Sequence, residues 1–244
     1  MSINSDFQFK KLADYAFMLQ DYRCASTTLD NLKREFQSSK MWRHYGATLY
    51  LMGLCSIFLP VLKDEDKHFE AALSVFSSKC NSSYHSVKTI WTCIEYFRHK
   101  GLYGDCIPWL VRQALDIPPV ISALFLEQAS NCFIRPEVGM QRKAMLQLLL
   151  ASEKYRQVGL LQNSVRCYRT LQPAIQKWNL ISSHCLVELA KNLIDLQQYE
   201  EAFETLCNVK NIELLNETQQ RFYVEQLART YSLKVIIFSL TEYE

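Results

Sequence analysis

The strongest constraint on the fold of this chain is an internal repeat that relates two distant stretches. Counting from Leu12-Ala13 and from Leu189-Ala190, eight identical residues fall at the same offsets within an 18-residue window that needs no gap. The six further matched pairs are Leu19 and Leu196, Gln20 and Gln197, Tyr22 and Tyr199, Ala25 and Ala202, Thr28 and Thr205, and Leu29 and Leu206. Such self-similarity is typical of repeat proteins, whose units bury their apolar faces by stacking on neighbours.

Two looser copies lie between these stretches, and together they resemble tetratricopeptide (TPR) hairpins. The pattern places a small residue where two antiparallel helices cross closely, and a Tyr over the turn; the expected crossing residues are Ala25, Cys106 and Ala202. The spacing of the copies departs from a strict period of about 34 residues, which favours a divergent solenoid. The third copy is marked by Gly101, Tyr103, Cys106 and Leu110, and the weaker fourth by Gly159, Val165 and Tyr168.

Apolar residues recur at helical spacing nearly throughout, and six Gly and six Pro in 244 residues leave little room for long loops. The sequence therefore predicts an all-α, TPR-like α-solenoid of antiparallel helix hairpins over residues 1–232. Residues 233–244 are predicted to be a tail, with a strand at Val235–Phe238, that begins a further domain. The predicted helices are near 6–20, 22–37, 41–59, 66–79, 84–100, 103–116, 119–132, 137–158, 162–176, 179–197, 199–210 and 217–231.

Several residues at the predicted boundaries have the chemistry of helix caps. Ser38 and Ser39 are expected to cap the helix that holds Trp42, and Asn81 to Ser83 the helix at 84–100. Asn216 and Gln219 have the spacing of a capping box. Pro118, Pro119 and Pro136 are expected in first helical turns, where proline is tolerated.

Charge is distributed unevenly although the net charge is only +2. Residues 121–183 contain eight Lys and Arg against three Asp and Glu, whereas residues 184–244 contain five against ten. Such a contrast can orient a docking partner. It is equally typical of ordinary solvated helix faces, and both interpretations remain open at this point.

The nine cysteines indicate free thiols. No two of them are closer than thirteen residues, no Cys-x-x-Cys occurs, and no secretory signal precedes them. We therefore expect buried, reduced cysteines that bind no metal. The uncharged run from His44 to Leu62 contains two Gly and a Pro and is interpreted as a buried core helix, because a membrane span needs about 20 predominantly apolar residues.

No motif of catalysis, cofactor binding or metal binding stands out, so the sequence predicts a protein that is not an enzyme and has no catalytic, cofactor-binding or metal site. The histidines are expected at surface or cap positions; they are His44, His68, His85, His99 and His184. The acidic run Asp64-Glu65-Asp66 is interpreted as a loop and helix start. Arg166, Tyr168 and Arg169 lie at helical spacing in a nearly neutral chain, which argues against nucleic-acid binding.

Several motifs resemble the helical-repeat region of the large TRAPP III-specific subunit of the transport protein particle (TRAPP), a vesicle-tethering complex. The most specific is the run from Ala123 to Ile134, with the pattern Leu-Glu-Gln-Ala-x-x-Cys-Phe-Ile, followed by Arg-Lys-Ala at 142–144. The resemblance extends over roughly residues 10–231. The remaining motifs that carry it are Lys11 to Asp14, Leu19 to Tyr22, Lys33 to Phe36, Tyr45 to Ala47 and Val165 to Tyr168.

This resemblance implies a scaffold segment of a TRAPP III-like complex that supports Rab GTPase activation in ER–Golgi traffic and autophagy. The implied partners are other TRAPP subunits and, indirectly, a Rab GTPase. The implied location is the cytoplasm, peripheral to Golgi, ER-exit and autophagosome-precursor membranes through the complex. Since the family's subunits are longer, the chain is expected to be a segment. No catalytic residue carries over.

Two other classes of function remain as alternatives. A free-standing TPR adaptor would bind peptides or partner helices in a groove lined by Asn, Lys and Arg at matching repeat positions. The equivalent positions of the clearest copies hold Tyr15 and Asn192, then Ala16 and Leu193, so the sequence shows no such groove. A helical enzyme would need a convergent polar pocket.

Overall fold

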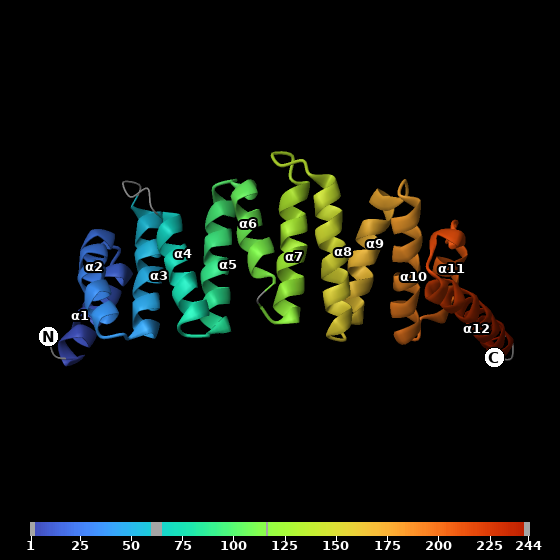
Figure 1. The fold of residues 1–244 in the computed structure, drawn as a ribbon, viewed down its shortest axis with the longest axis horizontal. Helices are drawn as coiled ribbons and strands as arrows, with labels where there is room; N and C mark the ends of the chain where they lie inside the picture. The colour runs from blue at the N-terminus through green and yellow to red at the C-terminus, as the bar shows by residue number, and fades with distance from the viewer. Residues whose placement is uncertain (1–2, 60–64, 116, 242–244) are drawn as a thin grey trace. The chain divides into compact units, whose positions relative to one another are not determined.

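The computed structural model describes residues 3–59, 65–115 and 117–241, with side chains described for 5–59, 67–115 and 117–232. The described part of the chain is all-α: it has twelve α-helices, is 82% helical and contains no strand. The predicted fold class is therefore confirmed. In each part of the chain the helices stand side by side and successive helices run in opposite directions (Figure 1).

The chain divides into two compact units, residues 1–109 and 110–244. The first unit contains α1 (Ile3–Met18), α2 (Tyr22–Ser38), α3 (Trp42–Phe58), α4 (Glu65–Ser78) and α5 (Ser83–His99), and α6 (Tyr103–Gln113) crosses the boundary. The second unit contains α7 (Pro119–Ile134), α8 (Gln141–Gln157), α9 (Leu161–Ile175), α10 (Asn179–Asp195), α11 (Tyr199–Cys207), a 3-10 turn (Ile212–Leu214) and α12 (Glu217–Thr241).

Five of the turns between helices have the same backbone geometry. The second residue after each of these helices has a positive φ: Gln20, Lys40, Gly101, Gly159 and Gln197. The N–H of this residue donates a hydrogen bond to the carbonyl oxygen three residues earlier, and the N–H of the following residue donates to the carbonyl oxygen five residues before itself. After α1 these bonds are Gln20 N–Phe17 O at 3.0 Å and Asp21 N–Ala16 O at 2.9 Å. This is the Schellman ending, which satisfies carbonyls left unpaired at a helix C-terminus. The repeated Gln20 and Gln197 therefore mark equivalent turns.

The expected crossing residues lie where the repeat pattern places them. Ala25, Cys106 and Ala202 are all 0% exposed. The Cys106 Sγ lies 3.7 Å from the Ile94 carbonyl oxygen of α5, so the second helix of this hairpin directly contacts the backbone of the first. In the fourth copy Ser164, also 0% exposed, makes the corresponding hydrogen bond to the Ser152 carbonyl oxygen at 2.9 Å.

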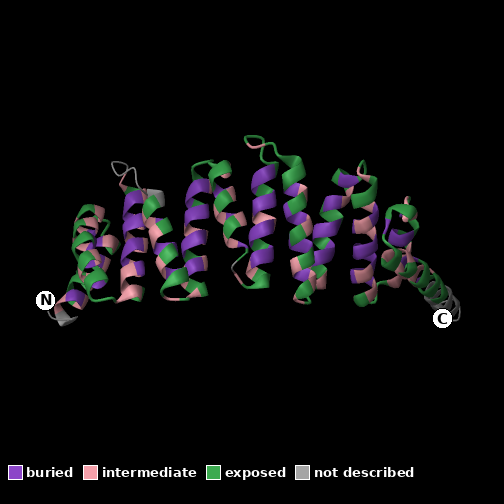
Figure 2. Cartoon of the chain, in the orientation of Figure 1, coloured by how far each residue is buried: buried purple, intermediate pink, exposed green. Residues whose placement is uncertain are grey.

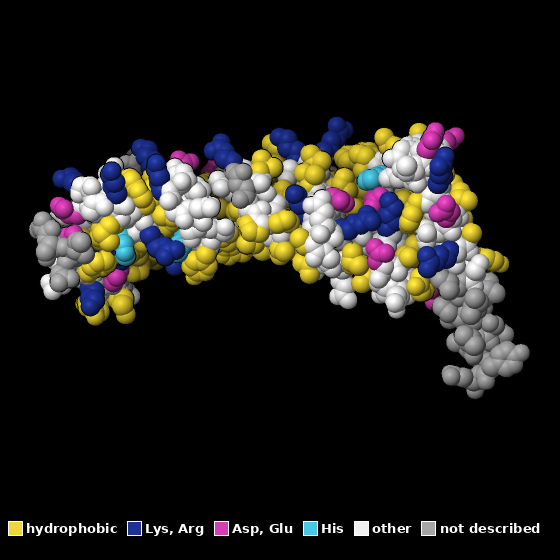
Figure 3. Space-filling view, turned by 60° about the horizontal axis from the view of Figure 1, so that its bottom comes forward, with side chains coloured by type: hydrophobic (Ala, Val, Ile, Leu, Met, Phe, Trp, Pro, Cys, Tyr) yellow, Lys and Arg dark blue, Asp and Glu magenta, His cyan; other side chains and the backbone are white. Residues whose placement is uncertain are grey.

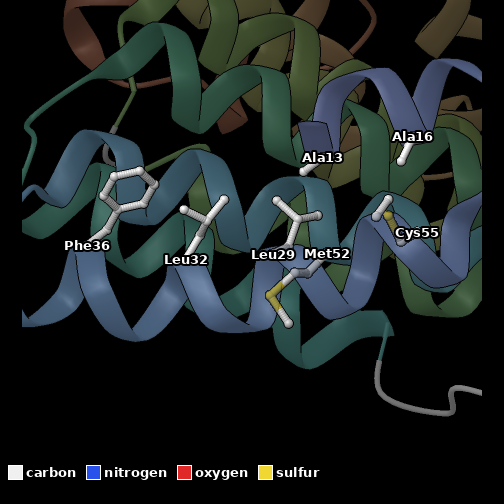
Figure 4. Packing of buried hydrophobic residues seen from close by; sticks show 8 residues of the cluster. Ala13, Ala16, Leu29, Leu32, Phe36, Met52 and Cys55 are labelled. Carbon is white, nitrogen blue, oxygen red and sulfur yellow. The ribbon is translucent and has the colours of Figure 1, made fainter. Parts of the chain in front are cut away.

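Buried apolar residues from neighbouring helices form the core of the first unit. Ala13 of α1, Leu29 and Phe36 of α2, and Met52 and Cys55 of α3 belong to one cluster (Figure 4). Burial follows the sides of helices that face their neighbours, and exposed residues lie along the outer sides and turns (Figure 2).

Helix α3 is the buried helix expected for the uncharged run after His44. Its glycines allow α4 to approach closely: a Cβ on Gly46 would lie 2.7 Å from the Phe76 ring, and one on Gly53 would lie 2.9 Å from the Phe69 ring. Phe76 and Phe69 are 2% and 0% exposed. The Phe76 ring packs against Gly46 and the Phe69 ring against Gly53, so a larger residue at either glycine position would overlap a ring. Residues 60–62 of the run lie outside the described residues.

Three sequence-based expectations about helix ends are wrong. No strand forms at Val235–Phe238, because α12 continues through these residues and the chain has no Gly or Pro after Asn216 to end it. Ser38 and Ser39 do not cap the N-terminus of α3. Both hydroxyls donate to the Glu35 carbonyl oxygen and so satisfy a carbonyl at the C-terminus of α2. Pro136 lies in a turn, and α8 begins later, at Gln141.

Other predictions about helix caps are confirmed in whole or in part. Asn216 Oδ1 accepts the Gln219 N–H at 2.8 Å, which is one half of the predicted capping box, whereas the Gln219 side-chain Nε2 pairs with His184 Nδ1. Pro119 is in the first turn of α7 and Pro118 is its N-cap residue. Ser82 occupies the N-cap position of α5, within the predicted Asn81 to Ser83 cap, but its hydroxyl pairs with His85 Nδ1 at 2.8 Å and makes no capping hydrogen bond to a backbone N–H.

Candidate interaction surfaces

His44, His85 and His184 contact neighbouring side chains of the fold. His44 packs against Phe7 and Phe36, with ring centroids 5.2 and 5.4 Å away. His85 stacks on Phe76; burial, followed by the charges of Arg43 and Lys88, lowers its pKa. His184 Nδ1 lies 2.7 Å from Gln219 Nε2. Among the described residues no group of three or more His, Cys, Asp or Glu could hold a metal ion.

Arg166, Tyr168 and Arg169, which raised the question of nucleic-acid binding, belong to the interior and to ion pairs. Tyr168 is 1% exposed. Arg166 pairs with Glu127 of α7 at 2.7 Å, and Arg169 pairs with Glu201 of α11 at 2.5 Å. The two guanidinium groups therefore bind carboxylates of helices in their own unit.

Glu127 is the centre of one polar cluster in the second unit. Its carboxylate accepts from Tyr155 of α8 and Arg166 of α9, both at 2.9 Å. Burial raises the pKa of Tyr155, and the hydrogen bond to Glu127 raises it further. The hydrogen bond to Glu127 also raises the pKa of Arg166. One carboxylate thus connects three successive helices. Glu127 is the Glu of the Leu-Glu-Gln-Ala motif.

Glu188 of α10 is the centre of a second polar cluster and is only 7% exposed. It pairs with Arg156 of α8 and with Lys191 at 2.6 Å. Burial alone would raise its pKa, but the hydrogen bond from Lys191 and the charges of Lys191 and Arg156 together lower it. The buried carboxylate is therefore held ionised, as a buried charge with partners can be.

Ion pairs within the second unit join the basic stretch 121–183 to the acidic stretch 184–244. Arg156 and Arg169 lie in the basic stretch 121–183, and their partners Glu188 and Glu201 lie in the acidic stretch 184–244. Figure 3 shows Lys and Arg side chains next to Asp and Glu side chains over the second unit. Opposite charges of the two stretches thus pair within the fold, an arrangement that neither sequence-based interpretation described.

All nine cysteines are free thiols, and six of them are buried. Cys24 and Cys80 are half-buried and Cys207 is exposed, so the expectation of burial holds for most but not all. Burial raises the pKa of Cys55 to about 11, and those of Cys167 and Cys185 to about 12. Since the thiolate is the reactive form, these three thiols are protonated and unreactive at neutral pH.

Thiol reactivity should separate Cys207 from the buried cysteines. At pH 8, far below the raised pKa values, Cys55, Cys167 and Cys185 remain protonated and should react with maleimide much more slowly than Cys207. Mass spectrometry of peptides after a timed pulse measures this order. Under denaturing, non-reducing conditions all nine should react. Labelling of Cys167 as fast as that of Cys207, or fewer than nine thiols, would contradict this assignment.

Two surface features could take part in binding. The first is an exposed apolar stripe on α1 and the residue that follows it, defined by Phe9, Leu12, Tyr15, Met18 and Leu19, with Met18 and Leu19 75% and 80% exposed. Phe9 and Leu12 also line a groove against α2. The second is a polar groove of about 570 Å³ in the second unit. Among the described residues, no helix is both long and apolar enough to span a membrane.

The polar clusters and the polar groove were not among the features predicted from the sequence. Glu127 was part of a motif, but its partners lie 28 and 39 residues later, and no local periodicity joins residues so far apart. Ser164 could have been found, because it lies five residues after Gly159, as Cys106 lies five after Gly101.

The fold and these surfaces define a class: an all-α helical-repeat protein of TPR-like hairpins with extended helix surfaces. Comparison with known proteins narrows this class. A family model described as the ER-Golgi trafficking TRAPP I complex 85 kDa subunit matches residues 2–101. The human trafficking protein particle complex subunit 8 is 23% identical over 219 residues, which are 88% of this chain. The resemblance to the helical-repeat region of the large TRAPP III-specific subunit is therefore confirmed.

The match covers little of the relative. The aligned part is 15% of the length of the human subunit, so the chain spans only a small part of that relative. The family model matches residues within the first unit, and the similarity to the human subunit covers most of the chain.

Proposed function

We propose that the chain is a non-catalytic scaffold segment of a TRAPP III-like complex that tethers vesicles and supports Rab GTPase activation in ER–Golgi traffic and autophagy. Its direct partners would be other TRAPP subunits, and a Rab GTPase would be an indirect one. The complex would keep it in the cytoplasm, peripheral to Golgi, ER-exit and autophagosome-precursor membranes. The observation that carries this proposal is similarity to a TRAPP subunit over 88% of the chain.

The surface of the first unit supports a scaffold role. The members of the apolar stripe recur every three residues along α1, from Phe9 to Met18, with Leu19 just after the helix, and they are 42–80% exposed. Exposed apolar side chains that gather on one element are typical of protein-binding sites. In the proposed function this stripe is a contact for another part of the complex.

The polar groups of the second unit support a non-catalytic role. Glu127 and Glu188 are the centres of the two polar clusters. Their carboxylates form ion pairs with Arg and Lys side chains, and these pairs connect neighbouring helices. Perturbed groups of catalytic sites usually converge on a cleft. Here each perturbed group serves the packing of neighbouring helices.

A free-standing TPR adaptor remains the alternative. Such an adaptor would present polar side chains from the first helices of its hairpins. Asn192, at the position where a groove residue would be expected, is 0% exposed and donates to Ser164 Oγ at 2.8 Å. The equivalent Tyr15 is 62% exposed and apolar in character. The matching polar positions of an adaptor are therefore absent from these two copies.

Deletion of this segment from the gene product that carries it tests the proposal. We expect weaker co-purification of the other TRAPP subunits, while Rab nucleotide exchange by purified core subunits in solution is unchanged. The purified 244-residue chain should not accelerate nucleotide release from any Rab by itself. Acceleration by the chain alone would contradict the scaffold role. Intact assembly after deletion would favour the adaptor.

A further inference from the structure

The apolar stripe of α1 has a counterpart in the second unit whose environment is known. The repeat relates each residue of the first hairpin to the residue 177 positions later, so Leu12 corresponds to Leu189 and Tyr15 to Asn192. Leu12 and Tyr15 are 48% and 62% exposed, whereas Leu189 and Asn192 are 2% and 0% exposed. Equivalent positions of the two hairpins are therefore open in one unit and covered in the other.

The inner sides of the two hairpins do not differ in this way. Ala13 and its counterpart Ala190 are 1% and 0% exposed, and Ala25 and its counterpart Ala202 are both 0% exposed. Each hairpin thus buries the residues between its own two helices. The difference lies on the side of the first helix that carries the stripe.

In the second unit the preceding hairpin, α8 and α9, covers this side of α10. Asn192 donates to Ser164 Oγ of α9 at 2.8 Å, and Glu188 pairs with Arg156 of α8. Leu189 lies three residues before Asn192 and therefore on the same side of the helix. This side of α10 is a stacking face between successive hairpins, which repeat proteins use to bury apolar surface that one unit cannot bury alone.

The grooves of the two hairpins agree with this comparison. Phe9 and Asn31 line the groove between α1 and α2, and their counterparts Leu186 and Asn208 line the polar groove of the second unit. In the second unit α9 supplies a further wall, which includes Gln172. The preceding hairpin thus borders the groove that corresponds to the one beside α1, so stripe and groove belong to one stacking face.

The charges of the two stacking faces are reversed. Lys11 stands where α10 has Glu188, and Asp14 stands where α10 has Lys191. Glu188 meets Arg156 of the hairpin that covers it. An Arg in the same place on α1 would face Lys11, and like charges across an interface are unfavourable. A hairpin that covers α1 therefore needs a carboxylate at the position that Arg156 has in α8.

We propose that the apolar stripe of α1 and the groove beside it bind a further helical hairpin of the gene product that carries this chain. That hairpin stacks on α1 as α8 and α9 stack on α10, and one of its carboxylates pairs with Lys11. The same polypeptide is the source because the hairpin that covers α10 is joined to it directly, through residues 176–178. The inference goes beyond the proposed function, which leaves the partner of the stripe unnamed, and it rests on two hairpins of this chain.

Photocrosslinking from position 15 in the full gene product tests the source of the hairpin. Tyr15 is replaced by the photoreactive residue p-benzoylphenylalanine, and Tyr84, which is 71% exposed on α5, is replaced in the control. Position 15 should crosslink to another helical stretch of the same polypeptide, with no gain of mass on a denaturing gel, and mass spectrometry identifies the peptide. A crosslink to another protein or to a second copy, or a yield no higher than that of the control, would overturn the proposal.

A fused chain tests the stacking and its charge requirement. A second copy of residues 141–178, with Arg156→Glu, is joined to residue 2, which the repeat places at the position of Asn179. Amide hydrogen exchange in α1 should be at least about tenfold slower than in the 244-residue chain, because a stacked neighbour stabilises a terminal repeat. Retaining Arg156 should reduce the effect, and Lys11→Glu should reverse the order of the two fused chains. Exchange as fast as in the unfused chain, or an order that Lys11→Glu leaves unchanged, would contradict the proposal.

The inference and the proposed function fail separately in these experiments. Capture of another TRAPP subunit at position 15 would overturn the inference and support the proposed function. A crosslink within the polypeptide, in a gene product that co-purifies with no TRAPP subunit, would support the inference and contradict the proposed function. Circular dichroism of each fused chain confirms that it is folded before exchange is measured.

Discussion

Phe76→Ala should lower the free energy of unfolding of the first unit by about 3–5 kcal/mol, the usual cost of truncating a buried Phe. The ring is 2% exposed and belongs to a core cluster with Leu49 and Ala72. It also fills the space above Gly46. Urea unfolding followed by circular dichroism measures the loss.

A double-mutant cycle with Gly46 makes this test specific. Gly46→Ala alone should cost about 1–3 kcal/mol, because its Cβ would overlap the Phe76 ring. In the Phe76→Ala background that overlap is gone, and the same change should cost little or even stabilise, since Ala favours helix over Gly by about 1 kcal/mol. Strictly additive costs would contradict the α3–α4 contact.

Ala202→Phe should be the second strongly destabilising substitution, by about 1–3 kcal/mol or more, and Ala25→Phe should behave alike in the first unit. Both alanines are 0% exposed and lie at the close crossing of a hairpin. A phenyl ring there would force the two helices apart. The measurement is the denaturant midpoint at an unchanged slope.

Glu204→Phe is the matched control, since Glu204 is an exposed residue of the same helix as Ala202. It should change stability by no more than about 0.5 kcal/mol. If both alanine variants unfold at the wild-type midpoint, the repeat alignment that relates the two hairpins is wrong.

Features with a local signal were predictable from the sequence. Apolar periodicity placed twelve helices, and the repeat placed Ala25 and Ala202 at crossings, because burial at a hairpin imposes a side-chain size at a fixed distance from the turn. Gln20 and Gln197 repeat because the same left-handed turn follows each first helix. The strand expected at Val235–Phe238 failed because β-branched composition is a weak preference that a continuing helix overrides.

Features built from distant residues were not predictable. The pairing of Arg156 with Glu188, and of Arg169 with Glu201, spans 32 residues in each case, close to one hairpin of the stack. A charge count over long windows detects the imbalance but not the partners. The groove between Lys177 and Lys210 likewise arises only when α9, α10 and the segment after α11 come together.

Affinity purification with quantitative mass spectrometry tests the central claim most directly. The tagged gene product that carries this segment is purified from cells, beside the same product bearing Ala202→Phe and Ala25→Phe and beside the exposed-site control Glu204→Phe. The account predicts that TRAPP subunits are the dominant co-purifying proteins and that the two-alanine variant loses most of them, whereas the control retains them. Recovery of no TRAPP subunit above background would contradict the assignment of this chain to a TRAPP III-like complex.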